Sequence, residues 1–215
     1  ITRSKPLGHL NALFINDANP MDVKDPLKAI DVALEQGAFI LWNHPGWPDD
    51  KSTLYPVHEE LLKANKIHGV EVLNYMEYYP VAFDWCNQYG IAPMANTDIH
   101  DLISGDYGWG GGKFRPLTLV FATERSEKGI KEALFARRTA ALFDGKLVGK
   151  PEYLMKLAEA SLKIRRISEK TIEVTNISDI PFEITNGGKL YLFPCRKTVR
   201  IGIPKEGALV FENCF

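Results

Sequence analysis

The chain has 215 residues, of which 45% are hydrophobic and 25% are charged, a composition of folded globular proteins and not of disordered ones. Its 26 basic and 27 acidic residues leave a net charge of -1, which excludes the strong overall field that recruits nucleic acid or an anionic membrane. Because no apolar run approaches the roughly 20 residues that span a bilayer and no signal peptide is visible, we expect a soluble protein, cytoplasmic or exported after signal removal, with no nucleic-acid partner and no membrane insertion.

Short apolar strands alternate with amphipathic helices from residue 7 to about residue 143. A first helix begins at Asp25 and Pro26 and ends at Gly37, since this order of cap, first-turn proline and glycine is typical of helix ends. We predict further helices at 57–65, 81–89 and 126–137, and strands at 10–15, 38–42, 69–73, 91–95, 117–122 and 140–143. The alternation favours an α/β layer or barrel with parallel strands, whose active site lies at the carboxyl ends of the strands.

After residue 150 the pattern changes to one helix followed by short alternating segments. The helix is predicted at 151–160, and the strands at 162–167, 171–175, 182–185, 190–193, 198–203 and 208–212. Turn signals such as Asn-Gly-Gly at 186–188 separate the strands. These features predict a small all-β, sandwich-like domain at residues 148–215, after a first domain at residues 1–147.

An Asp-x-His triplet follows the predicted strand at 91–95. Side chains alternate along an extended backbone, so Asp98 and His100 project to the same side. Carboxylate and imidazole are ligands for zinc, manganese or iron, and a metal needs more ligands than this pair supplies. Of the five histidines, His44 and His9 also stand where an apolar strand meets a turn, although His9 opens its strand instead of ending it.

Three segments in order resemble the later metal-binding motifs of the polymerase and histidinol phosphatase (PHP) superfamily: Gly-His-Leu-Asn-Ala-Leu at 8–13, Asn-His-Pro at 43–45 and Asn-Thr-Asp-Ile-His at 96–100. The resemblance covers roughly residues 1–145. It implies part of a distorted seven-stranded β/α barrel, similar to a TIM barrel, with two or three divalent metal ions (Zn, Mn or Fe). It also implies that His9, His44, Asp98 and His100 are metal ligands, and that Asp98 and His100 act in catalysis.

The family's first motifs, a His-x-His element, a further histidine and a glutamate, have no counterpart before His9. We expect either a carboxy-terminal piece of a longer enzyme, which the start at Ile1 favours, or a degenerate relative that assembles no metal cluster.

Other polar residues are candidates for binding the substrate. Arg3 and Arg115 carry guanidinium groups that match phosphate or carboxylate, and Arg115 follows a glycine-rich segment at 105–112. Asn74 ends the predicted strand at 69–73, and Glu71 is a charged residue within it. Both suggest roles in lining or supporting the pocket. We expect His58 to face solvent and His68 to lie at the opposite end of its strand, so neither is a ligand candidate.

The predicted function is a metal-dependent hydrolase that acts on a small anionic substrate, most simply a phosphoester, through water activated by bound metal ions. A carboxylic ester or carbamate hydrolase on the same site is one alternative, because all three reactions use the same kind of cluster. A non-catalytic barrel that binds a partner is the other. The sequence leaves the metal, the substrate and the oligomeric state open.

Overall fold

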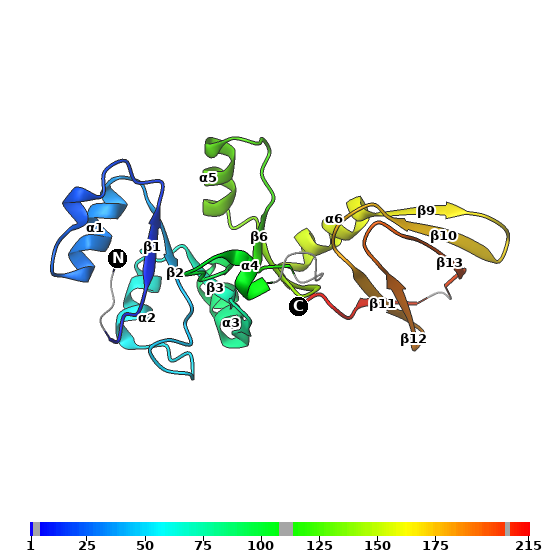
Figure 1. The fold of residues 1–215 in the computed structure, drawn as a ribbon, viewed down its shortest axis with the longest axis horizontal. Helices are drawn as coiled ribbons and strands as arrows, with labels where there is room; N and C mark the ends of the chain where they lie inside the picture. Colours follow the sequence, from blue (N-terminus) through cyan, green and yellow to red (C-terminus); the bar gives the residue numbers. More distant parts are fainter. Residues whose placement is uncertain (2–4, 108–113, 205–206) are drawn as a thin grey trace. The chain divides into compact units, whose positions relative to one another are not determined.

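The computed structural model describes residues 1, 5–107, 114–204 and 207–215 (Figure 1). These residues form two compact units, Ile1–Asp144 (unit 1) and Gly145–Phe215 (unit 2). Unit 1 contains β1 (Leu10–Leu13), η1 (Asn19–Met21), α1 (Pro26–Glu35), β2 (Phe39–Trp42), α2 (Pro56–Lys63), β3 (Gly69–Asn74), β4 (Glu77–Tyr78), α3 (Pro80–Tyr89), β5 (Ala92–Asn96), α4 (Ile103–Tyr107), β6 (Leu117–Val120), α5 (Glu127–Phe135) and β7 (Thr139–Phe143).

The helix ends of unit 1 follow from local sequence. The Asp25 side chain accepts the backbone N–H of Leu27 at 2.9 Å and begins α1, and Ser126 accepts the N–H of Gly129 at 3.0 Å and begins α5. Gly90 ends α3 with φ 63°, a left-handed conformation that glycine adopts without a steric penalty. The predicted helices are thus confirmed. Within the described ranges, no helix has both the length and the apolar character needed to cross a membrane.

The central sheet of unit 1 is only partly parallel. Strands β2, β3 and β5 are parallel neighbours, whereas β1 pairs antiparallel with β2 and β4 pairs antiparallel with β3. Burial matches this arrangement, since every residue of β2 and β3 is buried and β1 is partly open. The prediction of parallel strands is therefore right for β2, β3 and β5 and wrong for β1.

Strands β6 and β7 pair antiparallel with each other, which also departs from the predicted parallel order. They lie against β5 through side chains: the Thr118 hydroxyl bonds both the N–H and the carbonyl of Ala95 at 2.8 and 2.9 Å, and the Thr139 hydroxyl donates to the Pro93 carbonyl at 2.8 Å. Helix α4 (Ile103–Tyr107) includes the first residues of the glycine-rich segment at 105–112, and residues 108–113 lie outside the described ranges.

The core of unit 1 packs on both sides of the central sheet. One cluster consists of Phe39, Leu41, Ala92, Met94 and Leu134. The Phe39 ring packs closely against Gly69, where a side chain would clash, because a Cβ at Gly69 would lie 2.9 Å from the ring. In another part of the core, Trp42 stacks on the His58 ring at 3.9 Å between centroids. His58 is 1% exposed, so the expectation that it faces solvent is wrong: its helix turns this face to the core.

Unit 2 contains β8 (Lys146–Gly149), α6 (Pro151–Ser161), β9 (Leu162–Arg166), β10 (Thr171–Asn176), β11 (Phe182–Asn186), β12 (Lys189–Phe193), β13 (Thr198–Gly202) and β14 (Leu209–Phe211). Two three-stranded antiparallel sheets form, in the orders β13-β10-β9 and β12-β11-β14. Asn213 links the segments around them: it donates to the carbonyls of Gly145 and Pro181 and accepts the N–H of Glu183. The predicted helix and the sandwich-like set of six strands are confirmed.

Candidate metal centre

Strand direction brings the predicted ligands to one edge of the central sheet. His44 follows the carboxyl end of β2, and Asp98 and His100 follow the carboxyl end of β5. His9 precedes β1, but β1 runs antiparallel to β2, with Leu10 opposite Trp42. The amino end of β1 therefore lies beside the carboxyl end of β2, and the His9 carbonyl accepts the N–H of Asn43 at 3.0 Å. The antiparallel direction of β1 explains why His9 stood at the unexpected end of its strand.

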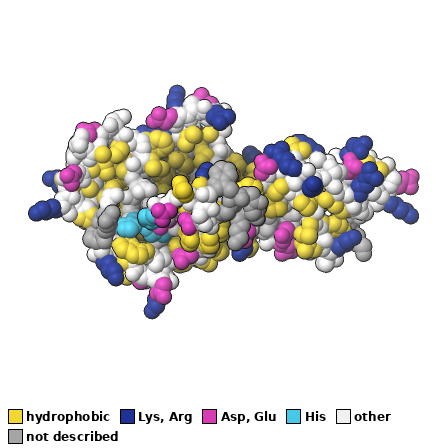
Figure 2. Space-filling model, viewed as in Figure 1, with side chains coloured by type: hydrophobic (Ala, Val, Ile, Leu, Met, Phe, Trp, Pro, Cys, Tyr) yellow, Lys and Arg dark blue, Asp and Glu magenta, His cyan; other side chains and the backbone are white. Residues whose placement is uncertain are grey.

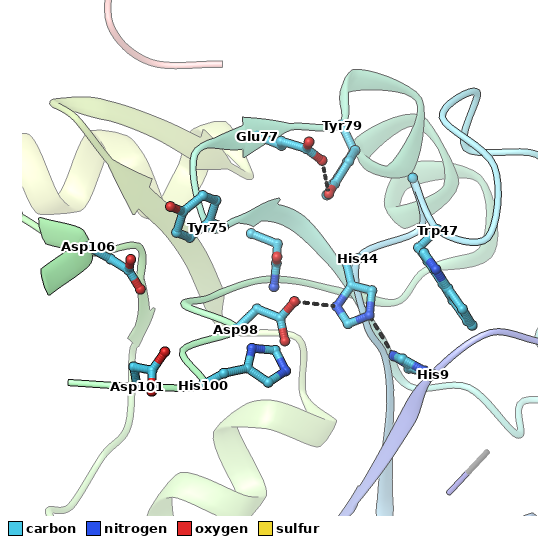
Figure 3. Close-up of a pocket in the computed structure, with 12 residues that line it drawn as sticks. His9, His44, Trp47, Tyr75, Glu77, Tyr79, Asp98, His100, Asp101 and Asp106 are labelled. Atoms are coloured by element: carbon cyan, nitrogen blue, oxygen red, sulfur yellow. Dashed lines mark hydrogen bonds and ion pairs between the residues drawn. The ribbon is translucent and has the colours of Figure 1, made fainter. Parts of the chain in front are cut away.

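The four predicted ligands line one pocket of about 580 Å³. His9 Nδ1 and His44 Nε2 are 2.8 Å apart, and His44 Nδ1 is 3.8 Å from Asp98 Oδ2 (Figure 3). His100 lies on the same pocket wall, and the Trp47 ring stacks on His9 at 4.3 Å between centroids. The full lining is His9, His44, Gly46, Trp47, Asn74, Tyr75, Glu77, Tyr79, Asp98, His100, Asp101 and Asp106.

His44 holds an unusual position. Its φ is 24°, and Asp98 has φ 50°; both are left-handed conformations that cost energy for residues other than glycine and that cluster at functional sites. Among the described residues, the buried Nδ1 of His44 has no hydrogen-bond partner, although the Glu71 Oε2 atom lies 3.6 Å away. Burial acts to lower the pKa of His44, but the neighbouring Glu71, Asp98 and Glu77 carboxylates outweigh it and raise the pKa above its usual value.

The pocket is acidic. Glu77, Asp98, Asp101 and Asp106 line it together with three histidines, and none of the described lining residues is Lys or Arg. Histidine side chains adjoin Asp and Glu side chains at the surface of unit 1 (Figure 2). The Tyr79 hydroxyl donates to Glu77 at 2.5 Å, and burial together with this bond raises the pKa of Tyr79. Such a lining favours a cationic occupant.

The whole chain is similar in structure to a solved protein. That protein, from Bacteroides vulgatus ATCC 8482, is described as a two-domain protein containing a predicted PHP-like metal-dependent phosphoesterase, and its crystal structure has 2.20 Å resolution. The TM-score is 0.89 with 35% sequence identity over 96% of this chain. The chain has a PHP-like two-domain fold. The predicted fold class, an α/β region followed by a small all-β domain, is thereby confirmed.

The PHP-like match covers 65% of the B. vulgatus chain, so the chain spans about two thirds of that protein's length. No family model and no curated protein matches the sequence. The likeness therefore supports the fold directly, and it supports an activity only as a proposal.

The residues predicted to bind the substrate differ in whether they line the pocket. Asn74 is buried and lines the pocket. Arg115 is exposed and is not among the described residues that line it, and Arg3 lies outside the described ranges. Sequence reasoning did not single out Glu77 or Asp101 for the pocket. The sequence offered one signal for them: Glu77 lies three residues after Asn74, and Asp101 directly follows His100 of the Asp-x-His triplet.

The histidine and carboxylate side chains of the pocket suit a divalent metal in kind. Imidazole and carboxylate bind zinc, manganese and iron, and the buried His44 Nδ1, which has no hydrogen-bond partner among the described residues, is a nitrogen atom that could bind a metal ion. Across the described parts of the chain, however, no three His, Cys, Asp or Glu side chains converge in a group that could hold a metal ion by itself. The described residues therefore supply some, but not all, of the ligands that a bound metal ion needs.

Proposed function

We propose that the chain forms part of a metal-dependent hydrolase, in the first instance a phosphoesterase, with two or three divalent ions (Zn, Mn or Fe). One observation carries the proposal: His9, His44, Asp98 and His100 come from separate parts of the chain and line one acidic pocket. Bound metal ions in such a site lower the pKa of a water molecule and polarise the scissile ester.

Each residue has a role in this proposal. His9, His44 and His100 would hold the metals through ring nitrogens. Asp98, whose carboxylate is 42% exposed and open to the pocket, would hold metal and accept a proton from water. Asn74 donates one amide hydrogen to Glu71 at 2.8 Å and has a second hydrogen for the substrate.

The acidic lining also bears on the substrate. A small anionic substrate is repelled by Glu77, Asp98, Asp101 and Asp106 unless cations lie between them. In this proposal an anionic ester would bind only when the metal ions are present. Removing the metal would therefore also abolish substrate binding.

Metal analysis combined with hydrolysis of a chromogenic phosphodiester and phosphomonoester tests the proposal. The full-length protein should contain stoichiometric Zn, Mn or Fe, should hydrolyse at least one of the two esters, and should lose activity with a chelator and regain it with added metal. Turnover of a neutral carboxylic ester with no phosphoester turnover would select the alternative hydrolase.

A non-catalytic barrel is the second candidate. It is favoured by the lack, in the described residues, of a group of three converging ligands. Full-length protein with neither bound metal nor turnover would support this candidate and refute the enzyme.

A further inference from the structure

Glu71 is a buried carboxylate beside the ligand pocket. It is 1% exposed and lies on β3, and its carboxylate bonds the backbone N–H of His44 and the amides of Asn74 and Asn96 and lies near the His44 ring. No Lys or Arg in the described part of the chain forms an ion pair with it. Because burying a carboxylate without a cation is costly, its hydrogen bonds have to compensate.

The Glu71 carboxylate joins the carboxyl ends of three parallel strands. Oε2 accepts the backbone N–H of His44, after β2, at 2.5 Å, and the amide of Asn74, at the end of β3, at 2.8 Å. Oε1 accepts the amide of Asn96, at the end of β5, at 2.8 Å. One side chain therefore sets the spacing of the strand ends that carry the proposed ligands.

These hydrogen bonds lie at or near the two proposed ligands with left-handed backbone conformations. His44, with φ 24°, is held directly through its N–H, and Glu71 Oε2 is also 3.6 Å from its ring. Asp98, with φ 50°, stands two residues beyond Asn96. Strained backbone persists only where the surroundings hold it in place. Glu71 bonds the backbone of His44 directly, and near Asp98 it bonds the side chain of Asn96, two residues earlier.

We propose that Glu71 is a positioning residue for the metal centre: by bonding His44, Asn74 and Asn96 together it holds His44 and Asp98 at the spacing that a shared metal site needs. The inference rests on the proposed function. This positioning role differs from an electrostatic effect of the Glu71 charge on the metal, because it depends on where the two carboxylate oxygens lie. Residues that orient metal ligands typically change metal affinity about 10–100-fold when they are lost.

Two substitutions in the full-length protein separate position from charge. Glu71→Asp keeps the charge but draws the oxygens away from their donors, and Glu71→Gln keeps the length but leaves one accepting oxygen for three donors. Titration calorimetry with Mn²⁺ should show affinity falling about 10–100-fold in both. The amide proton of His44, followed by NMR in metal-free protein, should move upfield in both as its hydrogen bond weakens.

Glu77→Gln is the matched control. It removes a pocket carboxylate that, among the described residues, accepts a hydrogen bond from the Tyr79 hydroxyl and from none of the donors that Glu71 binds. It should weaken Mn²⁺ binding less than either Glu71 variant and leave the His44 amide proton in place. Asn96→Ala removes one of the three bonds from a half-buried side chain, and its affinity should also fall, so it provides the test if the Glu71 variants do not fold.

The outcomes are distinguishable. Wild-type protein that binds no divalent metal overturns the proposed function. Wild-type protein that binds Mn²⁺ while Glu71→Asp or Asn96→Ala binds it equally well overturns the positioning role alone. An equal loss in Glu77→Gln and Glu71→Gln, with Glu71→Asp unaffected, assigns the effect to charge and also overturns it.

Discussion

Acidification should destabilise unit 1 through His58. The ring is buried against Trp42, its Nε2 donates to the Leu7 carbonyl at 2.9 Å, and its Nδ1 accepts the Tyr55 N–H at 3.3 Å. This pairing needs one protonated and one unprotonated ring nitrogen, so the native ring is neutral. A second proton would set an N–H of the ring against the Tyr55 N–H.

The sign and size follow from the pKa of His58. Burial lowers this pKa below 6.5, and the Leu7 carbonyl opposes the shift only in part. The unfolded chain therefore binds more protons than the folded one at pH values between the folded pKa and about 6.5. The stabilising effect of the neutral ring is fully present above pH 6.5 and is lost as the pH falls toward the folded pKa. The slope for one such group is at most about 1.4 kcal/mol per pH unit.

Urea unfolding of wild type and His58→Gln between about pH 5 and 7.5 measures this slope. All four tryptophans precede residue 145, so fluorescence follows unit 1. Glutamine keeps a donor and an acceptor without titrating, and it should cost about 1 kcal/mol at pH 7.5 through lost stacking on Trp42. The free energy of unfolding of wild type should then fall more steeply with acid than that of the variant. Equal pH dependence in the two proteins would refute the reasoning.

Three further predictions concern the site and the packing. His44→Ala and Asp98→Ala in the full-length protein should each lower metal content and reduce turnover at least about a hundredfold, because each removes a ligand; unchanged metal stoichiometry in both would contradict the assignment. Gly69→Ala places a Cβ 2.9 Å from the Phe39 ring and should lower the free energy of unfolding by about 1–3 kcal/mol in denaturant titrations. Asn213→Ala removes three hydrogen bonds within unit 2 and should cost at least about 1–3 kcal/mol, and a wild-type melting curve would show that water replaces them.

Local sequence determined the elements and the chemistry of the candidate ligands. The capping residues Asp25 and Ser126 and the terminating Gly90 define helix ends that the structure reproduces. The six strands of the two three-stranded sheets in unit 2 were also predicted, because alternation and turn residues depend on neighbours in the chain. The Asp-x-His triplet was recognisable for the same reason, since its spacing and residue types are local properties.

The tertiary structure decided which of these residues meet. His9 joins His44 only because β1 runs antiparallel to β2, and no local pattern states the direction of a strand relative to its partner. Burial of His58, and the two hydrogen bonds that tie Glu71 to His44 and Asn96, depend on residues 25 to 51 positions away in the sequence. Periodicity tells which side of a strand or helix is apolar, but hydrogen bonding between distant segments sets which strands pair, and this pairing forms the pocket.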